Sequence, residues 1–271
     1  MKVVLFCGGL GMRMRDGITS APKPMAMIGD RPLLWHVMRY YAHFGHTDFV
    51  LCLGYGASAV KDYFLTYDET RSNDFVLDGG GQVELFKRDI ADWRITFVDT
   101  GLHSSIGERL RRVRRIVKDE KMFLANYADV FTDAPLSDMV SRFAATDATV
   151  SLLAVPLQSS HHVVGISENG VITRVTPVRE LMHWENGGYF IMRPEIFDHI
   201  REGEDLVEDV LARLVPQGKV IAYPHKGYWT PADTVKERAQ MEEMYYQGNC
   251  PWMIWDPERS GRSMAGEPAA R

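Results

Sequence analysis

Cysteine is scarce in this sequence, with only three in 271 residues, at positions 7, 52 and 250. An odd number of widely separated cysteines supplies neither a disulfide framework nor the paired thiolates of a zinc knuckle. Long apolar runs are scarce as well, because the run nearest the N-terminus covers only residues 3–7. A secretion signal or a membrane span needs a longer run, so we expect a cytoplasmic protein that does not enter the membrane.

An excess of positive charge is also absent, since 31 Lys and Arg residues are outnumbered by 36 Asp and Glu residues and the net charge is −5. A broad basic surface for nucleic acid is therefore not expected. With 45% hydrophobic and 25% charged residues, the composition is that of a globular enzyme. A chain of this length can bury about three quarters of its unfolded surface and needs no covalent staples.

Short apolar runs alternate with helical patterns through the first half of the chain, which predicts an α/β fold with a mostly parallel sheet flanked by helices. The second half is richer in strands, and a Glu168-Asn169-Gly170 turn predicts a hairpin. The polar, glycine-rich stretch 68–81 predicts a long loop. Strands are expected at 3–7, 49–53, 93–98, 122–127, 149–155, 163–166, 171–175, 189–192 and 219–223, and helices at 32–44, 57–65, 108–117, 136–145, 206–214 and 234–247.

A glycine-rich turn, Gly-Gly-Leu-Gly-Met-Arg at residues 8–13, follows the first predicted strand. Such a turn directs backbone amides toward phosphate oxygens. Its spacing matches neither the dinucleotide-binding fingerprint nor the Walker loop. Lys23 follows between two prolines that hold it in an extended stretch. Two fixed cations, Arg13 and Lys23, beside such a turn suit a polyphosphate, and the alternative is a surface turn with two solvated charges.

This turn and the Pro22-Lys23-Pro24 element resemble the signature of the sugar-1-phosphate nucleotidyltransferases. Further stretches are similar to one branch, the glucose-1-phosphate cytidylyltransferases; they lie at 33–38, 98–101, 109–113, 186–190, 227–234 and 250–255. The resemblance implies transfer of CMP from CTP to a sugar 1-phosphate, best matched by α-D-glucose 1-phosphate, with Mg²⁺ as cofactor and pyrophosphate as second product. It also implies a homo-oligomer that serves nucleotide-sugar and polysaccharide biosynthesis.

The resemblance also implies how the chain is organised. We expect one Rossmann-like domain over residues 1–256, with a nucleotide-binding half up to about residue 135. The half beyond it would be a small β-rich, sugar-binding portion that ends in a C-terminal helix. Residues 257–271, rich in Pro, Glu, Arg, Ser, Gly and Ala, predict a disordered tail.

Four residues would carry the chemistry if the resemblance holds. Arg13 and Lys23 would contact the triphosphate and the leaving pyrophosphate, and Asp129 and Asp233 would hold the metal. From the residues alone, Asp129 follows an apolar strand, where α/β sheets place ligands, whereas Asp233 could instead cap the last helix. The residues implied for nucleotide binding are Phe6, Cys7, Gly8, Gly9, Gly11, Ser105, Ile106, Gly107 and Arg109, and those for sugar binding are Asn186, Gly187, Gly188 and Arg179.

The sequence departs from the family pattern around the base and the sugar. Met12 stands where the family usually has Thr or Ser. Ile106 replaces a usual Thr, and Ala128 replaces a usual Gly. A usual E-K-P element reads Val-Thr-Pro at 175–177, so its lysine is missing and Arg179 or Arg174 would have to substitute. The pair His161-His162 stands where Phe-Gly is usual. Two alternatives therefore stay open: the same reaction with another nucleotide or sugar, and a non-catalytic protein that binds nucleotide sugars.

Overall fold

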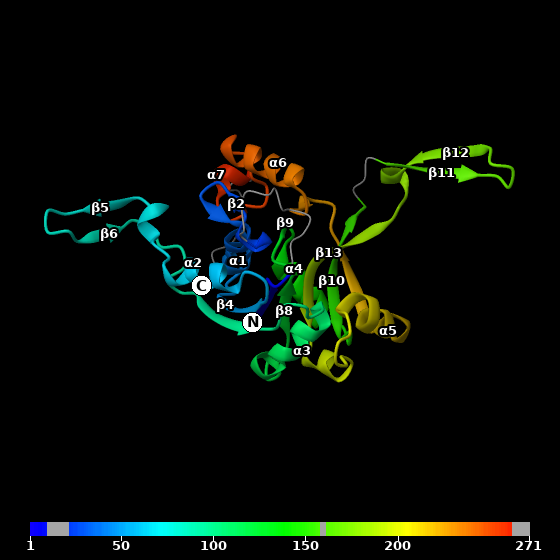
Figure 1. Ribbon diagram of the computed structural model, residues 1–271, viewed down its shortest axis with the longest axis horizontal. Helices are drawn as coiled ribbons and strands as arrows, with labels where there is room; N and C mark the ends of the chain where they lie inside the picture. The colour runs from blue at the N-terminus through cyan, green and yellow to red at the C-terminus, as the bar shows by residue number, and fades with distance from the viewer. Residues whose placement is uncertain (10–21, 158–160, 262–271) are drawn as a thin grey trace.

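The computed structural model describes residues 1–9, 22–157 and 161–261. Its centre is a seven-stranded sheet with the strand order β14-β10-β13-β8-β1-β4-β7 (Figure 1). Four of its six strand pairings are parallel, and β13 runs antiparallel to both neighbours. The sheet is thus mixed and mostly parallel, which confirms the predicted fold class. Its strands are β1 (Lys2–Phe6), β4 (Asp48–Leu53), β7 (Arg94–Asp99), β8 (Phe123–Asn126), β10 (Val150–Pro156), β13 (Trp184–Met192) and β14 (Val220–Pro224).

Both faces of the inner strands are buried, and for that reason β1, β4 and β8 read as nearly continuous apolar runs. Alternate residues of a strand point to opposite faces: Val3 and Leu5 pack into one core cluster, and Val4 and Phe6 into the other. The first cluster includes side chains of α1 (Leu33–His43), α2 (Ala57–Leu65), α4 (Leu136–Ala144) and α6 (Val235–Tyr246). The second includes side chains of α3 (Ile106–Val117), η6 (Leu206–Leu211) and α5 (Ala212–Leu214).

Short strands carry the loops at the carboxyl edge of the sheet. β9 (Val130–Thr132) pairs with β15 (Trp229–Pro231), and β2 (Met27–Ile28) pairs with β3 (Arg31–Pro32). The last segment packs onto this part of the molecule, where the buried Trp252 lies against Phe131 and Tyr228. Trp252 is therefore part of the hydrophobic core.

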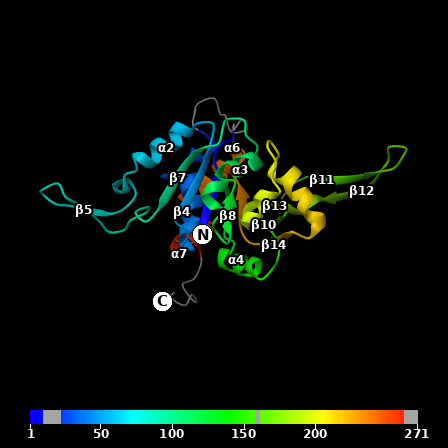
Figure 2. The same cartoon turned by 90° about the horizontal axis from the view of Figure 1, so that it is seen from below.

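Two hairpins extend from opposite sides of the body, as both views show (Figure 1 and Figure 2). We call them arm A, made of β5 (Phe75–Leu77) and β6 (Val83–Leu85), and arm B, made of β11 (His162–Ile166) and β12 (Ile172–Pro177). Arm B confirms the predicted hairpin. Arm A shows that the loop expected at 68–81 was wrong, because glycines 79–81 form the turn of a hairpin.

The C-terminal prediction also needs an adjustment. Pro257–Ser260, the first residues of the segment expected to be a disordered tail, form a short helix, α7, which Asp256 caps by accepting a hydrogen bond from the backbone of Arg259. In the part of the chain that the structure describes, no helix is both long and apolar enough to cross a membrane.

Candidate active site

A cavity of about 400 Å³ opens at the carboxyl ends of β1 and β8, the edge where α/β sheets usually bind ligands. It is lined by Phe6, Gly9, Lys23, Pro24, Ile106, Tyr127, Asp129, Val130, Glu185, Asn186, Trp229, Pro231 and Asp233. Besides the two aspartates, five residues expected in the site from the sequence meet on this lining: Phe6, Gly9, Lys23, Ile106 and Asn186. With the aspartates, they come from segments more than 200 positions apart in the chain.

A strained turn after β8 positions Asp129. Ala128 has φ of 65° and is the one non-glycine residue with positive φ among those described. The side chain of Asn126 holds this turn, because its Oδ1 accepts a hydrogen bond from the Ala128 backbone N–H at 2.6 Å. Strain of this kind costs about 1–3 kcal/mol and persists only where neighbouring structure enforces it.

The β9–β15 pairing brings the second carboxylate to the first. Val130 lies opposite Pro231 in this ladder, and the Ala232 N–H donates to the Asp129 carbonyl at 2.9 Å. Asp233 then follows at the mouth of the cavity. It does not cap the last helix, because Thr234 fills that position in a reciprocal capping box with Glu237. The carboxylate of Asp233 is therefore left for the site.

Lys23 joins the two carboxylates. Its ammonium donates to Asp129 Oδ2 at 2.6 Å and also to Asp233 Oδ1. Its side chain is 13% exposed, against 21% for Asp129 and 44% for Asp233. The predicted extended stretch was wrong at Lys23, because this residue begins a short 3-10 helix, η2 (Lys23–Met25), and only Pro22 before it is extended.

The electrostatics of this trio stabilise a cation between the two carboxylates. Burial on its own would lower the pKa of Lys23, but the charges and hydrogen bonds of Asp129 and Asp233 outweigh it and raise that pKa. Burial raises the pKa of Asp129, and the nearby Asp233 carboxylate adds to this effect against the opposing charge of Lys23. Two carboxylates that already share one cation are a suitable donor set for Mg²⁺, which commonly takes one or two carboxylates together with substrate phosphates.

The described residues offer no group of three or more His, Cys, Asp or Glu side chains that could enclose a metal. The two aspartates thus fit an ion that completes its coordination with phosphate and water. They do not fit a closed structural site.

Arg109 lies against Gly8, the first residue of the glycine-rich stretch. Its guanidinium, on a side chain only 2% exposed, donates to the carbonyl of Gly8 at 2.8 Å and to Thr100 Oγ1 at 2.8 Å. A Cβ added to Gly8 would lie 2.0 Å from Arg109 Nη1, so only glycine permits this approach. Phe6 and Gly9 line the cavity, whereas the Cys7 N–H bonds the Cys52 carbonyl within the sheet. Gly11, Met12 and Arg13 lie outside the described residues.

Residues 105–107, predicted to bind the nucleotide, lie at the start of α3, where one lines the cavity and two contact a neighbouring segment. Ile106 lines the cavity, but Ser105 caps the helix by accepting from the Glu108 N–H and donates to the Glu204 carbonyl. Gly107 faces the same neighbour, since an added Cβ would lie 2.4 Å from the Glu204 carbonyl oxygen. Ser105 and Gly107 therefore hold α3 against the 203–206 segment.

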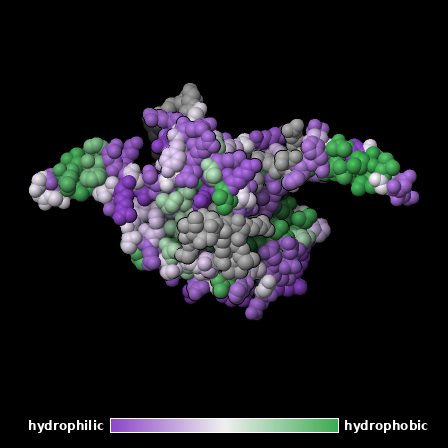
Figure 3. All heavy atoms as spheres, turned by 45° about the horizontal axis from the view of Figure 1, so that its top comes forward, coloured by the Kyte–Doolittle hydropathy of each residue, from purple (hydrophilic) through white to green (hydrophobic). Residues whose placement is uncertain are grey.

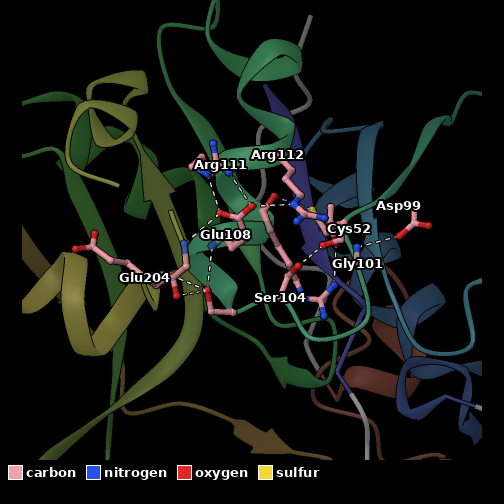
Figure 4. Close-up of polar contacts among 12 residues, drawn as sticks. Cys52, Asp99, Gly101, Ser104, Glu108, Arg111, Arg112 and Glu204 are labelled. Atoms are coloured by element: carbon pink, nitrogen blue, oxygen red, sulfur yellow. Dashed lines mark hydrogen bonds and ion pairs between the residues drawn. The ribbon is translucent and has the colours of Figure 1, made fainter. Parts of the chain in front are cut away.

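Two further arginines of α3, Arg111 and Arg112, are engaged by a carboxylate of their own helix. Glu108 accepts hydrogen bonds from Arg111 and Arg112 on the next turn (Figure 4). These bonds, that of Arg111 foremost, lower the pKa of Glu108 to about 2. Both arginine side chains remain partly exposed, as expected of a solvated helix face.

The opposite wall of the cavity comes from β13. Asn186 Nδ2 donates to the Tyr127 hydroxyl at 3.0 Å, and its Oδ1 accepts from the Gly188 N–H at 3.0 Å. The Gly187 carbonyl accepts from the Trp229 indole at 2.9 Å. The pairing with β10 shifts register here, between Leu152 and Ala154, so Gly187 and Gly188 lie in a bulge of β13. Arg179 lies in the short turn η4 (Val178–Glu180).

Six lining residues were not predicted as site residues: Pro24, Tyr127, Val130, Glu185, Trp229 and Pro231. Tyr127, Glu185 and Trp229 are the three that bring a polar group. Burial raises the pKa of Tyr127 to about 12, so its hydroxyl stays protonated and can donate to a ligand while it accepts from Asn186. Each of the three adjoins a motif that the sequence did reveal. The sequence could have pointed to them only through their positions, because Tyr127 directly follows β8 and Glu185 and Trp229 lie in β13 and β15, close to predicted site residues.

Comparison with known proteins agrees with this geometry. Residues 2–236 match the family described as nucleotidyl transferase. A protein of Bacillus subtilis (strain 168) named "Probable glucose-1-phosphate cytidylyltransferase" is 33% identical over 94% of this chain and 100% of its own length. The glucose-1-phosphate cytidylyltransferase of Salmonella typhi is 31% identical with the same coverage.

Solved structures give the same fold. The crystal structure of a UDP-glucose pyrophosphorylase complexed with UDP-glucose matches with a TM-score of 0.67 and 18% identity, over 91% of this chain and 98% of the other. At that identity the likeness concerns the fold alone. The chain belongs to the nucleotidyl transferase family, in its glucose-1-phosphate cytidylyltransferase branch.

Proposed function

We propose that this protein transfers CMP from CTP to a sugar 1-phosphate, with α-D-glucose 1-phosphate as the best match, and releases pyrophosphate. The observation that carries the proposal is the meeting of Lys23, Asp129 and Asp233 at the cavity. The names of the two relatives support the choice of CTP and glucose 1-phosphate. The product, a CDP-sugar, would serve polysaccharide biosynthesis.

In the reaction, a phosphate oxygen of the sugar 1-phosphate attacks the α-phosphorus of CTP, and the bond to the pyrophosphate oxygen breaks. No covalent bond to the protein is required, so the protein must align two anions and balance their charge. Asp129 and Asp233 would hold Mg²⁺, which supplies Lewis-acid stabilisation of the phosphate charge. Lys23 offers a point charge for the leaving group, a role that Arg13 would share.

The β13 wall would receive the sugar. Asn186 and Tyr127 form a linked pair of polar groups, and hydroxyls of a hexose can exchange hydrogen bonds with both. The Trp229 indole keeps the backbone of Gly187 in place. The side of the cavity near Phe6 and Ile106 is apolar and would face the base.

A substrate panel tests this proposal. The full-length protein would be incubated with Mg²⁺, each of four nucleoside triphosphates and a set of sugar 1-phosphates, and pyrophosphate release would be measured. We expect the highest kcat/KM with CTP and α-D-glucose 1-phosphate. If only another nucleotide and sugar 1-phosphate are turned over, the proposed substrates are wrong and the reaction class is right. If CTP binds and no pair is turned over, the non-catalytic alternative is favoured.

We further propose that the protein works as a homo-oligomer assembled through its arms. Apolar side chains cover both arms, as Figure 3 shows. A two-stranded hairpin is only marginally stable by itself in water, and contiguous apolar patches mark interaction sites. The exposed apolar residues are Phe75, Val76, Leu77, Val83 and Phe86 on arm A and Val163, Val164, Ile166, Val171, Ile172 and Val175 on arm B.

Light scattering after gel filtration tests the assembly. The wild-type chain is expected to elute as an oligomer, and Leu77→Asp or Ile172→Asp to shift it toward smaller species. Leu65→Asp is the control, because Leu65 is equally apolar and 79% exposed but lies on α2 and not on an arm. A wild-type monomer at micromolar concentration would contradict this proposal.

A further inference from the structure

We propose that Lys23 is an internal cation that occupies the two metal-binding carboxylates before the substrates arrive and is displaced from them when a divalent ion binds. This inference rests on the proposed function, since it takes Asp129 and Asp233 as the metal ligands. It assigns Lys23 a second role besides contact with the triphosphate. The lysine sets how tightly the ligand-free protein holds metal.

The ammonium of Lys23 is where a shared metal ion would be. It contacts one oxygen of each aspartate, Oδ2 of Asp129 at 2.6 Å and Oδ1 of Asp233. Mg²⁺ binds carboxylate oxygens at about 2.0–2.1 Å. An ion bound to the same two oxygens would lie within van der Waals contact of the ammonium and would be repelled by it. The two cations therefore exclude one another.

The backbone of Lys23 is held by hydrogen bonds, so a change at this residue falls on its side chain. The Met25 N–H donates to the Pro22 carbonyl at 2.8 Å, and the Ala26 N–H donates to the Lys23 carbonyl at 3.0 Å. Pro24 is buried. A lysine has a flexible four-carbon stem that ends in a compact charge. Displacement thus needs only side-chain rotation, which leaves the ammonium in the cavity.

Charge explains why the exchange would depend on the substrate. Without a cation, the two carboxylates would repel each other in a partly buried site, so the lysine stabilises the ligand-free state. A divalent ion that binds without a nucleotide must displace the Lys23 ammonium from both carboxylates, and the ammonium then has no anion to contact. An ion that arrives with a triphosphate brings an anion to which the released ammonium can turn. Metal binding and nucleotide binding therefore favour one another through Lys23.

The first test measures metal affinity without any substrate. Mn²⁺ would be titrated into the full-length protein and free Mn²⁺ followed by electron paramagnetic resonance. Lys23→Met is expected to bind Mn²⁺ at least about tenfold more tightly than wild type, although it turns over more slowly. Lys61→Met, which removes an exposed lysine from α2, should leave the affinity unchanged. Equal or weaker binding by Lys23→Met would overturn the proposal.

The second test uses the wild-type chain and so does not depend on the folding of a variant. Acetic anhydride would modify lysines with and without Mg²⁺, and mass spectrometry would give the rate at each position. The rate at Lys23 should rise several-fold with Mg²⁺ and fall again when CTP is added, while the rate at Lys61 stays constant. A rate at Lys23 that ignores Mg²⁺ overturns the proposal. Neither test requires turnover, so the substrate panel can fail or succeed separately.

Discussion

Ala128 illustrates how one residue can set the geometry of a reactive side chain. Its left-handed backbone turns the chain so that Asp129 follows β8 into the cavity, and Asn126 pins that turn through a buried hydrogen bond. The family pattern has glycine at this position, and glycine adopts positive φ without strain. Here the methyl group of Ala128 packs in the core instead. The sequence shows that alanine stands at position 128, but the backbone conformation of Ala128 depends on the contacts of the whole turn.

This view predicts a contrast between two substitutions. Ala128→Gly should change the free energy of unfolding by less than about 1 kcal/mol, because relief of roughly 1 kcal/mol of strain offsets the loss of a methyl group worth about 0.8 kcal/mol. Asn126→Ala should cost about 1–3 kcal/mol, because it leaves the buried Ala128 N–H without a partner. Urea denaturation of both variants provides the comparison. A larger loss for Ala128→Gly than for Asn126→Ala would show that the turn is not strained.

Arg109 shows the limit of residue-level inference. Its place in a motif predicted contact with the nucleotide, and the structure brings its guanidinium to Gly8, against backbone carbonyls. Motifs indicate which residues gather, whereas burial and competing partners decide which atom of each faces the ligand. Contact between Arg109 and a nucleotide therefore stays a prediction.

Among the elements, those with a clear hydrophobic period were predicted to within a few residues. α2 matches its expected range, Ala57–Leu65, and α4 ends one residue early, at Ala144. Arm A was missed because its strands are three residues each and expose apolar side chains. Such strands lack the alternation that a buried face imposes. Only the geometry of their pairing reveals them.

The start of α6 matters for the site because Thr234, and not Asp233, caps the helix, which leaves the Asp233 carboxylate available for a metal ion. Thr234 and Glu237 form the capping box, and Glu237 also accepts from the Asp233 N–H at 2.9 Å. Thr234→Ala is expected to lower the free energy of unfolding by about 1 kcal/mol. Thermal unfolding in the presence and absence of urea would measure it. Thr234→Ser, which keeps the hydroxyl, should stay within about 0.5 kcal/mol of wild type, and an equal loss in both variants would disprove the capping role.

At the scale of the whole molecule, buried histidines should make stability depend on pH. Burial lowers the pKa of His36 to about 4, and the charges of Arg31 and Arg259 add to this against a hydrogen bond to the Ile28 carbonyl. In the unfolded chain a histidine has a pKa near 6.5. Between these values the unfolded state binds a proton that the folded state does not, so stability falls as the pH falls from about 6.5 to about 4.

Urea denaturation at several pH values would measure this slope. His36 should contribute about 1.4 kcal/mol per pH unit within the window. His36→Gln keeps an N–H donor for the Ile28 carbonyl and should remove that share. His46, whose pKa burial also lowers to about 4, should still give a slope in this variant. An unchanged slope in His36→Gln would mean that the histidine titrates normally.

The proposed reaction depends on Asp129 and Asp233 at the cavity, and their substitution is its sharpest test. Formation of CDP-glucose from CTP, α-D-glucose 1-phosphate and Mg²⁺ would be followed by ³¹P NMR for the wild type, Asp129→Asn, Asp233→Asn and a control, Asp138→Asn. The side chain of Asp138 is 44% exposed, as is that of Asp233, but it lies on α4 beside Arg142. We predict product from the wild type and the control and a loss of about 10²-fold or more in both site variants. Full activity in Asp129→Asn or Asp233→Asn would contradict the assignment of the active site.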